Sequence, residues 1–296
     1  MATVSGVELW QWRLAARQQA IEADVPVAEV DWLLQDIAGL DRLALRFDLF
    51  KDRRAIDLRI ALSELNQLWQ QRLQQRVPIQ YLAGTTPWRQ FSLTVSPAVL
   101  IPRPETESLI DLAIAATQPN LSLRDGQWVD LGTGSGAIAL GLAATFPNAV
   151  VHAVDTSAEA LAIAQTNARQ MGFESQIQFH QGSWFQPLEP PGQLLSGVVS
   201  NPPYIPSAWL PDLQPEVTLH EPHLALDGGT DGLDCIRELV TTAPAYLISG
   251  GVWLIEMMAG QSAAVVELLQ AQGHYRDIQV HPDLAGIARF ALAYRV

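Results

Sequence analysis

The chain has 296 residues, of which 48% are hydrophobic and 17% charged, and its formal net charge is −13. This composition can bury a large core and excludes general disorder. The single cysteine, Cys235, excludes an intramolecular disulfide and a cysteine-based zinc cluster. Residues 86–296 carry a net charge of −12, with eight arginines and no lysine, which disfavours tight sequence-independent binding to nucleic-acid phosphates.

Residues 1–85 have the apolar spacing that is typical of helices. Apolar side chains recur at roughly helical intervals from Leu9 to Ile21, and Pro26 stands where a second helix can begin. A third helix is predicted over 56–77, because no helix breaker interrupts that segment. No strand-type alternation is visible in this region, so we expect a small all-α bundle over residues 1–85.

Residues 86–106 predict a β-hairpin followed by a stiff linker. Apolar and polar residues alternate over 91–95, as they do in a half-buried strand. A second apolar run, 99–101, comes directly before a proline-rich sequence. We expect these two runs to form the hairpin and a second domain to cover 107–296.

The second domain alternates short apolar strands with helical segments. This alternation favours an α/β fold with a mostly parallel sheet and helices on both faces. We predict strands at Trp128–Leu131, Val150–Val154, Ile177–His180, Gly197–Ser200 and Gly251–Met257. We predict helices at Glu107–Ala116, Ala137–Phe146, Ala158–Met171, Leu233–Leu247 and Ser262–Gln272.

A glycine-rich turn separates the first of these strands from its helix. The sequence Asp130-Leu131-Gly132-Thr133-Gly134-Ser135-Gly136 lets the backbone turn sharply and pass close to a ligand. Its spacing is not that of the dinucleotide fingerprint, and a triphosphate-binding loop is absent from the sequence. Asp155 ends the next strand and can accept both ribose hydroxyls of an adenosine ligand. The alternative is that Asp155 only caps the helix that follows it.

Asn201-Pro202-Pro203-Tyr204 follows the strand at 197–200 and is the most specific motif of the chain. The loop after a parallel strand lies at the carboxyl edge of the sheet, where ligands bind in such folds. Prolines have a fixed φ and no N–H, so the neighbouring carbonyls stay available as acceptors. Convergent acceptors beside the flat ring of Tyr204 suit a planar NH₂ group, either an amide or a base amine. The alternative is an ordinary proline-rich turn.

These three motifs, in this order, resemble the S-adenosylmethionine-dependent methyltransferases that act on planar nitrogen. Further segments resemble one family among them, the peptide chain release factor glutamine methyltransferases. The resemblance covers essentially the whole chain, and the segments that carry it are Pro78–Gly84, Ile101–Glu107, Glu221–Pro222 and Ala225–Leu233. It implies a seven-stranded, mostly parallel, Rossmann-like sheet, and transfer of a methyl group to the side-chain nitrogen of a glutamine.

The resemblance also implies roles for single residues. S-adenosylmethionine would contact Gly132, Thr133, Gly134, Ser135, Gly136, Asp155, Trp184 and Asn201. The glutamine amide would be held by Asn201, Pro202, Pro203 and Tyr204, of which Asn201, Pro202 and Tyr204 would be catalytic. Ser183 stands where the family usually has Asp, and Glu256 receives no role because its surroundings depart from the family pattern.

We therefore expect a cytoplasmic enzyme that methylates release factors in translation termination, with the first domain recognising the protein substrate. The beginning of the chain has no secretory signal pattern, and no metal site is expected, because His220 and His223 flank a proline. One alternative is an adenine-N6 DNA or RNA methyltransferase, which the charge of residues 86–296 disfavours. Another is a protein that binds S-adenosylmethionine without transferring its methyl group.

Overall fold

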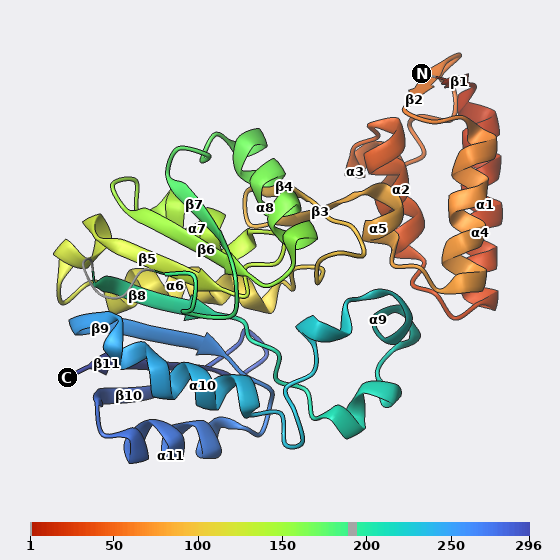
Figure 1. The fold of residues 1–296 in the computed structure, drawn as a ribbon. Coiled ribbons are helices and arrows are strands. Elements are labelled where there is room, and N and C mark those ends of the chain that lie inside the picture. Colours follow the sequence, from red (N-terminus) through yellow and green to blue (C-terminus); the bar gives the residue numbers. More distant parts are fainter. Residues whose placement is uncertain (1, 189–193) are drawn as a thin grey trace. The chain divides into compact units, whose positions relative to one another are not determined.

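The computed structural model describes residues 2–188 and 194–296, so Met1 of the first predicted domain lies outside the described residues. The chain forms two compact units. The first contains residues 1–84 together with 214–220, and the second contains 85–213 and 221–296. Figure 1 shows the helical character of the first unit and the central sheet of the second.

The first unit is mainly helical, with its core around residues such as Leu33 and Trp69. Its helices are α1 (Gly6–Glu22), α2 (Ala28–Ala38), α3 (Arg42–Arg46), α4 (Leu62–Gln75), α5 (Ile79–Ala83) and α9 (Pro215–His220). The N-cap Ser5 and Glu8 form a capping box, which satisfies backbone N–H groups at the start of α1.

The expectation of an all-α first domain was wrong in one detail. β1 (Ala2–Val4) and β2 (Ile56–Leu58) pair as a two-stranded antiparallel sheet. Three residues contain too little alternation to distinguish a strand from the start of a helix, and β2 alternates buried and exposed residues only over that length. The helix predicted from residue 56 consequently begins at Leu62.

Helix α9 is placed in the first unit by the salt bridges of Glu216. The buried Arg72 on α4 donates to Glu216 at 2.7 Å and also contacts Glu29 of α2. Arg76 approaches the same Glu216 oxygen at 3.0 Å. Because Arg72 is almost fully buried, both carboxylates are needed to compensate its charge.

The hairpin of the second unit differs from the expected one. It consists of β3 (Thr85–Trp88) and β4 (Phe91–Thr94), paired antiparallel. The predicted strand at 91–95 is present, but its partner precedes it and is not the apolar run at 99–101. Pro87 obscured the first strand in the sequence, although an edge strand tolerates proline.

The central sheet has seven strands in the order β10-β11-β9-β8-β5-β6-β7. Strands β5 to β9 are parallel, and β11 is antiparallel to both of its neighbours. This confirms the mostly parallel α/β fold. The strands are β5 (Gln127–Leu131), β6 (Val150–Asp155), β7 (Ile177–Gln181), β8 (Leu195–Ser200), β9 (Leu247–Glu256), β10 (Tyr275–Pro282) and β11 (Ala288–Arg295).

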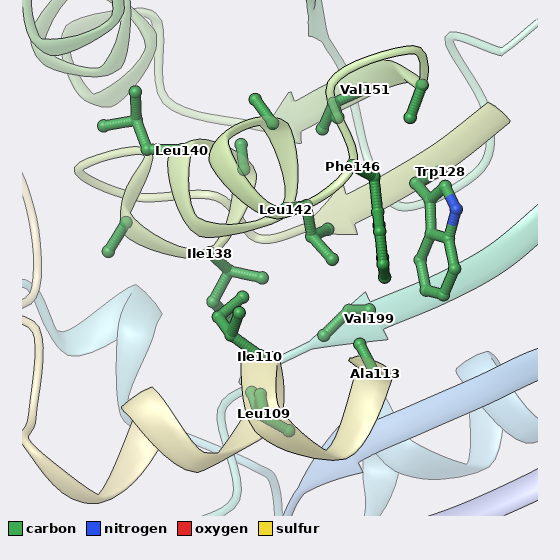
Figure 2. Packing of buried hydrophobic residues seen from close by; sticks show 14 of the residues in the cluster. Leu109, Ile110, Ala113, Trp128, Ile138, Leu140, Leu142, Phe146, Val151 and Val199 are labelled. Carbon is green, nitrogen blue, oxygen red and sulfur yellow. The ribbon is translucent and has the colours of Figure 1, made fainter. Parts of the chain in front are cut away.

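Helices pack against both faces of this sheet. The first face is covered by α6 (Ser108–Ala116), α7 (Ala137–Thr145) and α8 (Ala158–Met171), and the second by α10 (Asp234–Thr242) and α11 (Ser262–Gln272). Figure 2 shows part of the first layer, in which Ile110, Leu142 and Phe146 face Trp128 and Val199 of the strands. Neighbouring residues of one strand alternate between the two cores, since Trp128 belongs to the first and Val129 to the second.

The strand order creates a switch point between β5 and β8. From β5 the chain proceeds outward to β6 and β7, and it then returns to β8 on the other side. The loops that leave the carboxyl ends of β5 and β8 therefore diverge and leave a crevice for a ligand. In the described residues, no helix is long and apolar enough to cross a membrane.

Candidate active site

The glycine turn leaves β5 directly at the switch point. Gly132, Gly134 and Gly136 all have positive φ, which side chains other than glycine rarely adopt. The N–H groups of Gly132 and Thr133 both donate to the Val154 carbonyl at 2.9 Å, which ties the turn to β6. The turn is thus held by backbone bonds to the neighbouring strand.

Asp130 lies beneath this turn and is fully buried. Its Oδ2 accepts from the Thr133 hydroxyl at 2.6 Å and from the Ala139 N–H at 3.0 Å, whereas its Oδ1 has no hydrogen-bond partner in the described part of the chain. Burial raises the pKa of Asp130 to about 7, partly offset by these two bonds. The carboxyl group therefore retains an unused acceptor beneath the turn.

Asp155 at the end of β6 connects two parts of the candidate site. Its Oδ2 accepts from the Gly134 N–H and its Oδ1 accepts from the Ser157 N–H, both at 2.9 Å. The side chain that caps α8 is Ser157, whose hydroxyl accepts from the Ala160 N–H at 3.1 Å. Asp155 therefore shapes the glycine turn, and each of its oxygens retains a lone pair for a ligand.

A cavity of about 250 Å³ opens between these loops. Of the residues singled out in the sequence, its lining includes Gly132, Gly134, Asp155, Trp184, Asn201 and Pro203. The indole of Trp184 lies close to Gly132, where an added Cβ would be 3.7 Å from the ring. The lining also contains Asp227 and Cys235, which no sequence motif predicted as site residues.

The other candidate residues lie outside this lining. Thr133 and Ser135 are buried, and Gly136 packs so closely on α8 that an added Cβ would lie 3.1 Å from the Cβ of Ala164. Pro202 is buried, and the Tyr204 hydroxyl donates to Glu256 at 3.0 Å. The structure thus brings together the glycine turn, Asp155, Trp184 and Asn201, and it ties the Tyr204 hydroxyl to Glu256.

The Asn-Pro-Pro-Tyr loop is held by the side chain of Gln261, a buried residue outside the motif. Its side-chain amide donates to the carbonyls of Tyr204 and Gly232, at 3.0 and 3.1 Å, and its Oε1 accepts from the Met258 N–H. Gly232 approaches so closely that an added Cβ would lie 2.3 Å from the Tyr204 carbonyl oxygen. This contact explains why a glycine-rich segment, 225–233, accompanies the loop.

Two further residues of the site were missed in the sequence. Glu256 at the end of β9 accepts from the Thr106 hydroxyl at 2.6 Å, and Thr106 in turn accepts from Asn201 Nδ2 at 3.2 Å. Burial raises the pKa of Glu256, while the hydroxyls of Thr106 and Tyr204 lower it. A carboxylate at the carboxyl end of a strand beside β8 was a usable signal, because such ends share one edge of the sheet.

The proline-rich linker before α6 is fixed by Glu221. This buried carboxylate accepts from Arg103 at 2.6 Å and from the Ile101 N–H at 3.3 Å. The linker Ile101–Glu107 and the segment Glu221–Pro222, which both carry the family resemblance, are therefore partners in space. Their contact holds the linker that carries Thr106.

The fold and the crevice at its switch point define an α/β methyltransferase. Residues 108–208 match the family model described as "Methyltransferase small domain". Among solved structures, the chain is similar to the hMettl16 catalytic domain in complex with a 3′UTR hairpin, with 15% sequence identity and a TM-score of 0.53. That match covers 81% of this chain and 84% of the other and supports the fold alone.

Curated relatives identify the family. The release factor glutamine methyltransferase of Synechocystis is 52% identical, over 98% of this chain and 97% of the relative. The relative of that name from Thermosynechococcus vestitus is 46% identical over 96% of each chain. The chain belongs to the release factor glutamine methyltransferase family.

Proposed function

We propose that this protein transfers the methyl group of S-adenosylmethionine to the side-chain amide nitrogen of a glutamine in peptide chain release factors. The observation that carries this proposal is the placement of Asn201 on the wall of the cavity beside the glycine turn. Membership of the family supplies the substrate class. The protein would act in the cytoplasm, at translation termination.

The residues around the cavity fit S-adenosylmethionine. The glycine turn leaves room for a ligand, since a Cβ added at Gly134 would meet nothing within 4 Å. Asp155 can accept from the ribose hydroxyls with its free lone pairs, and Trp184 offers a flat apolar face to the adenine. Buried Asp130 beneath the turn has an Oδ1 without a hydrogen-bond partner among the described residues, and this acceptor suits a ligand with cationic groups.

When bound, S-adenosylmethionine supplies an electrophilic methyl group. An amide nitrogen is a poor nucleophile, because its lone pair is delocalised into the carbonyl. The Asn201 side-chain oxygen and the Pro202 carbonyl would accept the two amide hydrogens and aim the nitrogen at the methyl group. Such positioning lowers a barrier by about 7–11 kcal/mol. The Tyr204 ring would flank the amide. The new N–CH₃ bond would form as the S–CH₃ bond breaks, with the demethylated cofactor leaving. The nitrogen would then lose one proton to water, so no side chain needs to remove it before transfer.

The protein substrate is favoured over a nucleic acid by charge. Residues 86–296 carry a net charge of −12, and acidic residues such as Asp155 and Asp227 line the cavity. A phosphate backbone would be repelled by this unit. The first unit contains ten of the chain's 18 basic residues and would contribute to recognition of the release factor.

The test is a methyl-transfer assay with labelled S-adenosylmethionine. Purified release factor and unmethylated DNA are supplied side by side, and the labelled product is mapped by mass spectrometry. Label on one glutamine of the release factor supports the proposal. Label on DNA adenine overturns the substrate class, and binding of S-adenosylmethionine with no transfer to either substrate indicates a non-enzymatic protein.

A further inference from the structure

Asn201 can contact a substrate amide in two ways, because its side chain has an oxygen at one end and an NH₂ group at the other. Only the oxygen can accept a hydrogen from the amide nitrogen that is to be methylated. In the opposite rotamer, the NH₂ group of Asn201 would face the NH₂ group of the substrate, and two groups that only donate cannot form a hydrogen bond with each other. The orientation of the Asn201 side chain therefore decides whether the site can bind its substrate productively.

The contacts behind Asn201 determine this orientation. When Glu256 is ionised, its carboxylate can only accept hydrogen bonds, so the Thr106 hydroxyl, 2.6 Å away, then gives its proton to it. The hydroxyl has a single proton, and its oxygen can then only accept from Asn201 at 3.2 Å. Asn201 must consequently turn its Nδ2 toward Thr106 and its Oδ1 away from it.

The surroundings keep this chain of hydrogen bonds in place. Thr106 and Glu256 are 3% and 2% exposed, so water does not compete for their polar atoms. Glu256 follows Ile255, which is the register partner of Ser200, and this places it beside the start of the Asn-Pro-Pro-Tyr loop. Its second oxygen accepts from the Tyr204 hydroxyl, so one carboxylate bonds the last residue of the loop directly and the first residue through Thr106.

We propose that Glu256 and Thr106 are positioning residues, which act through hydrogen bonds to set the side-chain orientation of Asn201 and thereby make methyl transfer possible. This inference rests on the proposed function for its effect on turnover. Neither residue touches the substrate in this scheme. The hydroxyl of Thr106 and the acceptor oxygens of Glu256 are the atoms that matter.

The first test compares Thr106→Val with Thr106→Ser. Valine preserves the shape but removes the hydroxyl, and serine restores it. We expect Thr106→Val to lower kcat for the release factor about 10- to 100-fold, with an affinity for S-adenosylmethionine close to that of the wild type. Thr106→Ser should recover most of the loss. Equal kcat values for the two variants would show that the hydroxyl has no such role.

The second test asks whether Glu256 acts through Thr106. Glu256→Gln is combined with Thr106→Val in a Tyr204→Phe background, which removes the second hydroxyl bonded to Glu256. In this background, kcat is measured for both single variants and the double variant. If the two residues act in one chain, the double variant should lose no more activity than Thr106→Val alone. If the fold losses of kcat in the two single variants multiply in the double variant, Glu256 does not act through Thr106, and the proposal is overturned.

A third measurement needs neither turnover nor a stable variant. The side-chain NH₂ of Asn201 is followed by NMR in uniformly ¹⁵N-labelled wild-type protein, and its signals are assigned by their absence in Asn201→Ala. A bond to Thr106 should slow their exchange with water relative to an exposed asparagine such as Asn148. Exchange as fast as that of Asn148 would overturn the inference. If the wild type methylates no release factor, the proposed function fails, while this measurement still tests the orientation.

Discussion

The glycine turn after β5 and the Asn-Pro-Pro-Tyr loop after β8 leave neighbouring strands at the same edge of the sheet. The glycine turn is held by the next strand along the chain, β6, since the carbonyl of Val154 and the carboxylate of Asp155 bond its N–H groups. The second loop is held by side chains that come from far along the chain. Thr106 lies 95 residues before Asn201, and Gln261 lies 57 residues after Tyr204.

Each loop lies over a buried carboxylate, and the two carboxylates differ in how they are bonded. Glu256 accepts one hydrogen bond on each oxygen. Asp130 accepts both of its bonds on Oδ2 and leaves Oδ1 without a partner among the described residues. The glycine turn (the first loop) thus depends on its backbone conformation above Asp130, which has one oxygen without a partner among the described residues. The Asn-Pro-Pro-Tyr loop (the second loop) depends on side chains bonded to both oxygens of Glu256.

The largest effect is expected at the second loop, for Asn201→Ala. Loss of the amide oxygen removes an acceptor for the substrate, and kcat should fall about 10²- to 10³-fold while the fold survives. Asn148→Ala removes an exposed asparagine whose amide bonds Asp125, and it serves as the control. Labelled methyl transfer and urea unfolding are measured for both. Near-normal turnover of Asn201→Ala would remove the loop from the chemistry.

The carboxylate beneath the first loop should make stability depend on pH. The pKa of Asp130 is raised to about 7 by burial, so between pH 4 and 7 the folded state binds more protons than the unfolded state. Stability conferred by the protonated form is present at low pH and is lost as pH rises toward and through the folded pKa. The change amounts to a few kcal/mol.

Asp130→Asn removes the titrating carboxyl group. The variant therefore separates the contribution of Asp130 to the pH dependence from the contributions of the other titratable groups. The difference in free energy of unfolding between the variant and the wild type should move in favour of the variant from pH 4 to 7 and level off above about pH 8. Urea titrations in the absence of S-adenosylmethionine measure it. A difference that stays constant across this range would show that Asp130 ionises normally.

The same contrast between the loops explains what the sequence could predict. Helices Ala158–Met171 and Ser262–Gln272 were predicted with their observed bounds, and the five predicted strands of the sheet are present. Such elements follow local periodicity and local capping, as does a glycine turn. Glu256 and Thr106 were missed as a pair because their contact depends on how β9 and the linker meet in space. Strand β10 was not located individually because it is largely exposed and its apolar pattern is weak.

Alanine substitutions of two glycines in the glycine turn should have different effects, one on S-adenosylmethionine binding and the other on stability. Gly134 and Gly136 both have positive φ, but an added Cβ meets nothing within 4 Å at Gly134 and lies 3.1 Å from Ala164 at Gly136. Gly136→Ala should lower the free energy of unfolding by about 1–3 kcal/mol, whereas Gly134→Ala should mainly weaken S-adenosylmethionine binding. Calorimetric titration and urea unfolding of both variants decide this. Equal stability losses would show that backbone strain alone governs the turn.

The smallest expected effect comes from Ser157→Ala, and it distinguishes capping of α8 from ligand binding at the end of β6. Ser157→Ala removes the side-chain cap of α8 and should cost about 1 kcal/mol of stability. Ser157 also lines the cavity, but its loss should weaken S-adenosylmethionine binding less than Asp155→Ala does. Asp155→Ala removes the contacts to Gly134 and Ser157 and, in the proposed site, the acceptor for the ribose. It should weaken S-adenosylmethionine binding strongly. If Asp155→Ala behaves like Ser157→Ala in both measurements, Asp155 is a structural residue of the helix start, and the glycine turn then positions the ligand without a carboxylate at its edge.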